Sequence, residues 1–111
     1  MKIDNYDNYV VLADDHDDLA EFASFLEFQI LNKFKGQNVV INLQDYPALK
    51  LKELLLFLKT SNKHRATKQS FVLVTDAVDP DTIPMELVVV PTLQEAADIV
   101  EMEEIERDLG F

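Results

Sequence analysis

The sequence contains no cysteine and only two glycines among its 111 residues. Without cysteine the chain cannot form a disulfide, a thiol nucleophile or a cysteine-based zinc site. Gly36 and Gly110 are too far apart for a glycine-rich phosphate-binding loop, which excludes the common nucleotide-binding motifs. Packing alone must therefore stabilise the fold, and the 48% of residues that are apolar suffice for one continuous core.

Positive charge is also scarce, because 10 Lys and Arg residues stand against 21 Asp and Glu residues. The formal net charge of −11 repels nucleic-acid phosphates and anionic lipid surfaces. The sequence also lacks the apolar region of a signal peptide and any apolar run long enough to span a bilayer. We therefore expect one cytoplasmic domain over residues 1–111 that binds neither nucleic acid nor a membrane.

The apolar residues recur in patterns that alternate between those of strands and those of helices. Strands are predicted at residues 9–12, 39–43, 71–75 and 87–90, with an edge strand around Lys2 and Ile3. Helices are predicted from Asp17 or Asp18 to Gly36, from Leu49 or Lys50 until the polar segment of residues 60–69, and from Thr92 onward. This order favours the α/β class, with a single mixed sheet of four to five strands covered by helices.

The last two helices have apolar patterns that predict their buried faces. In the second helix the buried face is expected to contain Leu51, Leu54, Leu55 and Leu58. In the last helix, which starts with a capping box at residues 92–95, it is expected to contain Leu93, Ala96, Ala97 and Val100. Beyond Glu101 the apolar positions are Met102, Ile105 and Leu109, displaced by roughly half a turn at ~100° per residue.

Two segments carry a likeness to a known family. Asn38-Val39-Val40-Ile41-Asn42-Leu43 forms the predicted central strand, and Val90-Pro91-Thr92-Leu93-Gln94-Glu95-Ala96 leads into the last helix. With the order of the elements, these segments resemble the STAS domain of anti-sigma-factor antagonists over nearly the whole chain. The resemblance implies a STAS-like fold and a regulatory, non-catalytic role in binding another protein.

The chain departs from that family where its signalling members offer a serine to a partner kinase. The corresponding residues, about 50–54, contain no serine, threonine or aspartate, and Asn42 stands where the usual strand-end aspartate lies. We therefore expect no phosphorylation switch in this chain. The resemblance still implies a protein-binding surface near the start of the second helix, at Tyr46, Leu51, Lys52 and Glu53.

The C-terminal run from Glu101 to Phe111 is similar to the tail of short bacterial proteins that are sometimes labelled ribonuclease Z. Enzymes of that name need a histidine-rich zinc motif, whereas this chain has only His16 and His64. No serine has a histidine at a spacing that indicates nucleophilic catalysis. We therefore predict no catalytic residue, no cofactor and no enzyme activity, with an accessory role beside such a hydrolase as an alternative.

Two charged clusters have both a structural and a functional interpretation. Asp14-Asp15-His16-Asp17-Asp18 offers ligands for a cation, but acidic residues are also favoured at a helix start, and we predict no metal site. Six of the ten basic residues fall in one stretch, namely Lys50, Lys52, Lys59, Lys63, Arg65 and Lys68. The residues at and beyond the C-terminal end of the second helix, namely Lys59, Lys63, His64, Arg65 and Lys68, complement the negative end of its dipole, or they bind an acidic partner segment such as the tail of a second copy.

Apolar residues outside the predicted core indicate protein-binding surfaces. Met102, Ile105 and Leu109 form a second apolar face on the last helix, so residues 101–111 are the expected docking end. The apolar residues of the first helix that lie off its buried stripe are Phe25, Phe28 and Leu31. We predict that the chain binds a protein partner through the last helix and Phe28. A homodimer is one form of that partnership, and a carrier of a small ligand or lipid with the same fold is the alternative.

Overall fold

The computed structural model describes residues 1–110 and contains one five-stranded sheet. The strands, in the order in which they lie side by side, are β1 (Lys2–Asn5), β2 (Val10–Ala13), β3 (Val39–Asn42), β4 (Phe71–Val74) and β5 (Val88–Val90). β1 pairs with β2 in antiparallel orientation, and all other neighbours are parallel. The predicted α/β class and mixed sheet are therefore confirmed.

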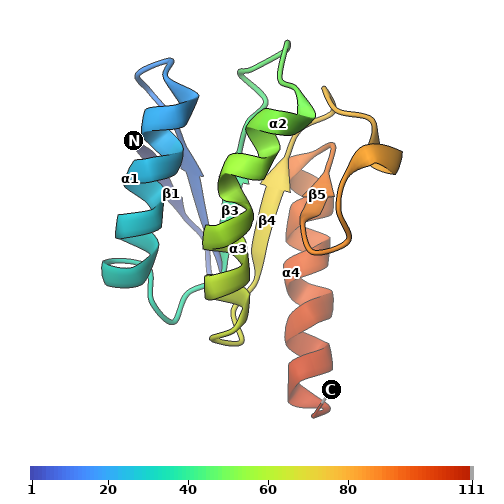
Figure 1. The fold of residues 1–111 in the computed structure, drawn as a ribbon. Helices are drawn as coiled ribbons and strands as arrows, with labels where there is room; N and C mark the ends of the chain where they lie inside the picture. The colour runs from blue at the N-terminus through green and yellow to red at the C-terminus, as the bar shows by residue number, and fades with distance from the viewer. Residues whose placement is uncertain (111) are drawn as a thin grey trace.

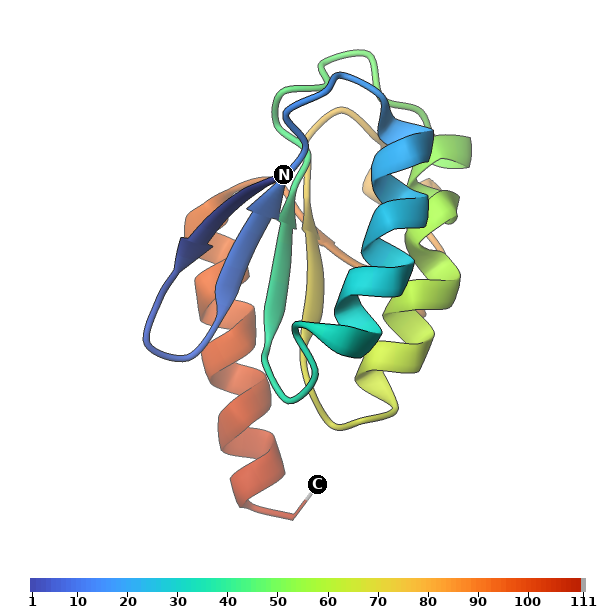
Figure 2. The same cartoon turned by 90° about the vertical axis from the view of Figure 1, so that its left-hand side faces the viewer.

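Helices cover both faces of the sheet (Figure 1). The elements on the first face are α1 (Leu19–Asn32), α2 (Leu51–Leu54), the 3₁₀ turn η1 (Leu55–Phe57) and α3 (Leu58–Arg65). A second 3₁₀ turn, η2 (Pro80–Thr82), precedes β5, and α4 (Leu93–Asp108) lies on the opposite face, as Figure 2 shows. Among the described helices, α4 alone covers that face. Within residues 1–110, no helix has the length and apolar content needed to cross a bilayer.

The central strands are buried on both faces, as their unbroken apolar runs predict. Val39 and Ile41 of β3 belong to the large apolar cluster under α1 and α3. Val40 points the other way and packs with Val72 and Val100 in a smaller cluster under α4. Full burial of such side chains stabilises the fold by roughly 1.5–3 kcal/mol each, so two apolar layers hold the sheet between its helices.

Side-chain caps fix the starts of α1 and α4. The Asp18 carboxylate accepts a hydrogen bond from the Glu21 N–H at 3.1 Å, and the Thr92 hydroxyl accepts one from the Glu95 N–H at 3.1 Å. The hydrogen bonds of the described residues include no reciprocal bond from Thr92 to the Glu95 carboxylate, so only half of the predicted capping box forms. After α1, Gly36 adopts a φ of +80°, which glycine tolerates without strain.

The second predicted helix is interrupted by η1. A 3₁₀ turn advances roughly 120° per residue instead of ~100°, so the buried stripe rotates at this point. Leu54 and Phe57 are buried, whereas Leu55 is exposed. The prediction that Leu55 faces the core is therefore wrong. Phe57 takes that place and meets Phe22 of α1 edge to face, with ring centroids 6.3 Å apart.

The first turn of α4 also differs from the prediction. Ala96 and Val100 are buried against the sheet, and Ala97 is half-buried. Leu93, however, is exposed. It is the first residue of α4, directly after the Thr92 cap and the turn that follows β5. The buried face of α4 thus starts at Ala96.

Candidate functional site

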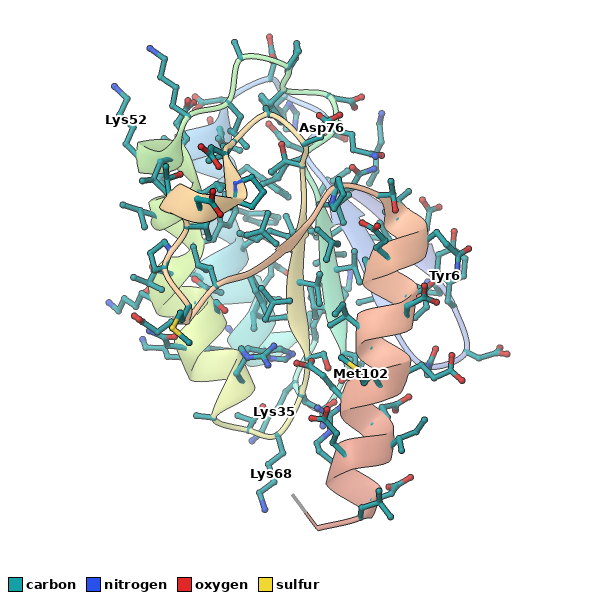
Figure 3. The ribbon with its side chains drawn as sticks, turned by 90° about the vertical axis from the view of Figure 1, so that its right-hand side faces the viewer. Tyr6, Lys35, Lys52, Lys68, Asp76 and Met102 are labelled. Carbon is teal, nitrogen blue, oxygen red and sulfur yellow. The ribbon has the colours of Figure 1, made fainter. Side chains whose placement is uncertain are left out.

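α4 has an apolar outer side in addition to the side that faces the sheet. Ala96 and Val100 face the sheet and are buried. Met102, Ile105 and Leu109 lie on the opposite side at ~100° per residue, and they are 48%, 53% and 67% exposed. We call these three residues the outer stripe of α4, and Figure 3 labels Met102 on this helix. Their i, i+3, i+7 spacing is typical of a helix that docks in a groove.

The side of α4 that faces the sheet becomes polar after Val100. Glu103 and Arg107 continue the spacing of the buried residues before them. Because α4 runs antiparallel to β4, these residues lie beside the N-terminal ends of the strands, where Asn38 and Ser70 precede β3 and β4. The inner side of the C-terminal half of α4 therefore makes polar contacts, while the apolar residues of this half lie on the outer side.

Glu103 is held by an ion pair across the end of the sheet. The two guanidinium NH₂ groups of Arg65 donate to its two carboxylate oxygens at 2.6 and 3.4 Å. Burial acts to raise the pKa of Glu103, but hydrogen bonds from Arg65 and Ser70 and the positive charges of Arg65 and Arg107 outweigh it. The pKa of Glu103 therefore lies below its ordinary value. Its ionised form ties α4 to the end of α3.

Asn38 connects α4 to the sheet. Its amide NH₂ donates to the Asn8 carbonyl at 2.9 Å, and its Oδ1 accepts from the Ser70 N–H at 2.8 Å and from Arg107 Nη2 at 3.1 Å. The Asn8 side chain in turn donates to Glu104 Oε1 at 2.7 Å. We call these contacts and the Arg65–Glu103 pair the α4 polar network. Its members are Asn8, Asn38, Arg65, Ser70, Glu103, Glu104 and Arg107.

Sequence reasoning missed the α4 polar network. One signal was available, because Glu103 and Arg107 stand at i+3 and i+7 from Val100 and so continue the buried stripe. Arg65 and Glu103 are 38 residues apart, and Asn38 and Arg107 are 69 residues apart. No local pattern indicates which residues meet at such separations.

Carboxylates flank the outer stripe of α4. Glu101 and Glu106 lie on either side of it, and Asp98 and Asp108 lie near its ends, all of them exposed. Asp98 accepts a hydrogen bond from Gln94 at 3.2 Å. Within residues 1–110, Glu101, Glu106 and Asp108 form no ion pair. The outer stripe therefore lies in a negatively charged surface.

Phe28 lies on a second exposed face with apolar and basic residues. We call it the α1–α3 face, and it consists of Phe28, Leu31, Leu56, Lys59 and Lys63. The three apolar members are 66%, 50% and 46% exposed, in that order. The ammonium groups of the two lysines lie 3.2 and 3.8 Å from the same oxygen of Glu27 on α1. One carboxylate thus serves two positive charges, so this face keeps a net positive charge.

Comparisons with known proteins give matches in fold. No curated protein and no protein-family model matches this chain. The protein TM1081, solved by NMR, superposes with a TM-score of 0.68 at 17% sequence identity, over 89% of this chain and 86% of its own. The RsbS protein of Moorella thermoacetica, in a form with one serine-to-glutamate substitution, gives a TM-score of 0.64 at 18% identity, over 91% and 94% of the two chains.

A chain from the stressosome, described as a signal integration and transduction hub, gives a TM-score of 0.61 at 17% identity. The match covers 91% of this chain and 96% of that one. The chain has a STAS-like fold. This likeness confirms the fold implied by the sequence segments around β3 and the start of α4.

In this STAS-like fold, the four residues predicted at the start of α2 are mostly turned inward. Tyr46 and Leu51 are half-buried and pack against the large apolar cluster. The Glu53 carboxylate accepts a hydrogen bond from the Lys50 N–H at 3.0 Å and so caps the helix. Of the four, only Lys52 is exposed. A partner that binds here would meet Lys52 and the loop before α2.

The acidic cluster before α1 has structural roles. The Asp14 carboxylate accepts hydrogen bonds from the Tyr46 hydroxyl and, at 3.0 Å each, from the N–H groups of His16 and Asp18. Burial acts to raise the pKa of Asp14, but these hydrogen bonds outweigh it and hold the pKa below its ordinary value. Asp15 binds the N-terminal amino group at 2.7 Å. Across residues 1–110, no group of acidic and histidine side chains is arranged to hold a metal ion.

Two surface pockets bear on the alternative of a ligand carrier. One, of about 200 Å³, lies beside α1 and is lined by Met1, Phe22 and Phe25 with charged residues. The other, of about 370 Å³, lies near Tyr6 and Gly36 and is lined mainly by polar residues. Small-ligand sites usually have ~300–1,000 Å³ and mainly apolar walls. Neither pocket combines that size with such walls.

The predicted binding residues lie on three separate surfaces of the structure. The outer stripe of α4 and the α1–α3 face lie on opposite faces of the sheet (Figure 2). The start of α2 lies at the end of the molecule away from the C-terminal end of α4 (Figure 1). The three surfaces therefore cannot form one continuous site within a single copy of the chain.

Proposed function

We propose that this chain, acting as one domain over residues 1–111, is a non-catalytic interaction module that regulates a protein partner. The observation that carries the proposal is the outer stripe of α4, where three apolar side chains face outward between carboxylates. Exposed apolar residues with a polar rim often mark a protein-binding surface. Covering these half-exposed side chains contributes about 1 kcal/mol each to binding. The likeness to a stressosome chain, from a signalling hub, supports a regulatory role.

We also propose that this regulation needs no phosphorylation switch at the start of α2. No serine or threonine occurs between Asn42 and Lys59. The first hydroxyl side chains of α3, Thr60 and Ser61, are buried, so a kinase could reach them only if the helix opened. The Tyr46 hydroxyl donates to Asp14. Partner binding at the start of α2 therefore does not depend on a phosphorylated serine or threonine at that position.

A photo-crosslinking residue in place of Ile105 tests the proposal in the full chain inside its native cells. The same residue in place of Gln94, which is exposed in the first turn of α4, is the matched control. We expect a discrete crosslinked product from position 105 and none from position 94. Met102→Gln and Leu109→Gln should remove that product. Equal products from both positions, or one that survives both substitutions, contradict the proposal.

The identity of the crosslinked partner also tests the accessory role beside a ribonuclease Z-type hydrolase, which stays a prediction. Native mass spectrometry of the purified chain tests the carrier alternative, because a carried lipid or small ligand would add a defined mass.

A further inference from the structure

Two exposed faces of the chain each contain apolar side chains, and the charged residues around them have opposite signs. On α4 the outer stripe lies between Glu101 and Glu106, neither of which forms an ion pair within residues 1–110. The α1–α3 face carries exposed apolar side chains beside Lys59 and Lys63. Two surfaces with apolar centres and charges of opposite sign are complementary.

We propose that these two faces bind each other between copies of this chain. The outer stripe of α4 in one copy docks on the α1–α3 face of the next copy. The apolar side chains of the two faces cover each other, and Glu101 and Glu106 approach Lys59 and Lys63. This inference rests on the proposed function, because it names a second copy as a partner of the outer stripe.

The lysines of the α1–α3 face have capacity for a further carboxylate. Lys59 and Lys63 share one oxygen of Glu27, at 3.2 and 3.8 Å. Each ammonium group has three N–H donors, so both retain donors for an acceptor from outside the chain. A glutamate from the α4 of another copy supplies that acceptor and balances the second positive charge.

The same charges disfavour a contact between two α4 helices. A twofold contact through the outer stripe places Glu101, Glu106 and Asp108 of one copy beside the same residues of the other. Like charges 4 Å apart repel by about 1 kcal/mol per pair even in water. Basic residues that could relieve this repulsion are absent from the outer side of α4, because Arg107 is engaged with Asn38 and Ser70. The α1–α3 face is therefore the better partner.

The two faces lie on opposite sides of the sheet (Figure 2), so the contact between them is heterologous. Each bound pair still has one free α4 and one free α1–α3 face, and association continues beyond a dimer. The net charge of −11 on each copy opposes this association at long range. At an ionic strength of ~0.15 M the Debye length is about 8 Å, which weakens the long-range repulsion more than the local contacts.

Sedimentation of the purified chain over a range of concentrations tests this proposal. One variant carries Met102→Gln, Ile105→Gln and Leu109→Gln, and a second carries Phe28→Gln and Leu31→Gln. All five residues are exposed, and glutamine is a good helix former, so both variants should fold like the natural chain by circular dichroism.

We expect the average mass of the natural chain to rise with concentration beyond that of two chains. Each variant alone should stay a monomer, because it lacks one of the two faces. A 1:1 mixture should form a dimer and stop there, because the two variants together retain one intact pair of faces. The proposal is overturned if the natural chain stays monomeric, if the Phe28→Gln, Leu31→Gln variant assembles like the natural chain, or if the mixture stays monomeric.

These outcomes are separate from those of the crosslinking experiment. A monomeric natural chain whose position 105 still crosslinks to another protein overturns self-assembly and leaves the proposed function standing. A chain that assembles in the expected way but gives only products with itself at position 105 supports self-assembly and contradicts regulation of a different protein through this stripe.

Discussion

Glu103 occupies a position on α4 where helical spacing alone calls for an apolar residue. Its carboxylate lies between Arg65 and Arg107 and is only 15% exposed. When one member of such a pair is removed, the other loses its partner while it remains partly shielded from water. The side chain of Glu103 therefore has a structural role, and that role depends on its negative charge.

We predict that Glu103→Gln lowers the free energy of unfolding by about 1–2 kcal/mol at pH 7. Because the pKa of Glu103 is lowered in the folded chain, its contribution is present above the ordinary carboxyl pKa and is lost as the pH falls through the lowered value. The difference between the natural chain and the variant should therefore shrink below about pH 4. Urea unfolding at pH 7 and pH 3 measures it.

The control for this measurement is Glu106→Gln, at an exposed position on the same helix. It should change the free energy of unfolding by less than about 0.5 kcal/mol at either pH. A Glu103→Gln effect of the same size at pH 7 and pH 3 would mean that its charge contributes nothing.

His64 gives a second pH-dependent prediction. It lies in the last turn of α3, where it is buried with its Nε2 2.6 Å from the Gln37 carbonyl oxygen, and burial lowers its pKa. The unfolded chain therefore binds a proton on this residue at a higher pH than the folded chain does. The free energy of unfolding should fall as the pH drops from about 7 to about 5. His64→Gln should remove this part of the pH dependence, whereas His16→Gln, at an exposed position, should leave it unchanged. Urea unfolding of the natural chain and both variants at pH 7 and pH 5 measures the difference.

At the scale of elements, α4 consists of two halves with different contacts. Its first half packs apolar side chains on the sheet, and its second half is held by the α4 polar network. A deletion of the C-terminal end therefore removes both the outer stripe and the contacts that hold the helix. Point substitutions in the outer stripe separate the two effects.

We predict that deletion of residues 102–111 lowers the free energy of unfolding by about 2–4 kcal/mol, because Arg65, Asn38 and Ser70 lose their partners on α4. The variant with Met102→Gln, Ile105→Gln and Leu109→Gln should stay within about 0.5 kcal/mol of the natural chain. Urea unfolding of both proteins measures the difference. Equal destabilisation by the two changes would show that the outer stripe itself stabilises the fold.

The elements differ in how much of their structure the sequence predicts. β4 and residues 39–41 of β3 are unbroken apolar runs, which are typical of a strand covered on both faces, and both strands were predicted. Leu55 was misplaced because η1 changes the rotation per residue, which apolar spacing does not reveal. The outer stripe was visible as a half-turn shift after Glu101, but the polar contacts on the inner side of the same half of α4 join residues far apart in sequence. Whether the stripe binds a partner stays a prediction.

At the scale of the whole molecule, the sheet separates a negatively charged helix from a face with net positive charge. Figure 3 shows Lys52 and Met102 on opposite sides of the sheet. A chain with complementary faces on opposite sides can bind copies of itself in one direction. Its net charge of −11 acts against that contact. Local complementarity and overall repulsion therefore predict opposite effects of charge substitutions on the association between copies.

Charge reversal distinguishes the two effects. Glu101→Lys with Glu106→Lys brings the net charge from −11 to −7, because each change adds two positive units. If overall repulsion governs association, this variant should assemble more readily than the natural chain. If the two faces bind each other, it should assemble about tenfold more weakly, because two lysines then face Lys59 and Lys63.

Adding Lys59→Glu and Lys63→Glu to the same chain restores the net charge of −11 and exchanges the charges of the two faces. We expect association to return toward that of the natural chain in sedimentation at ~0.15 M salt. The new glutamates lie near Glu27, but exposed pairs of this kind change stability by less than about 1 kcal/mol, so the chain should stay folded. If the four-residue variant associates no better than the Glu101→Lys, Glu106→Lys variant, the charges of these two faces do not meet, and the contact between copies lies elsewhere.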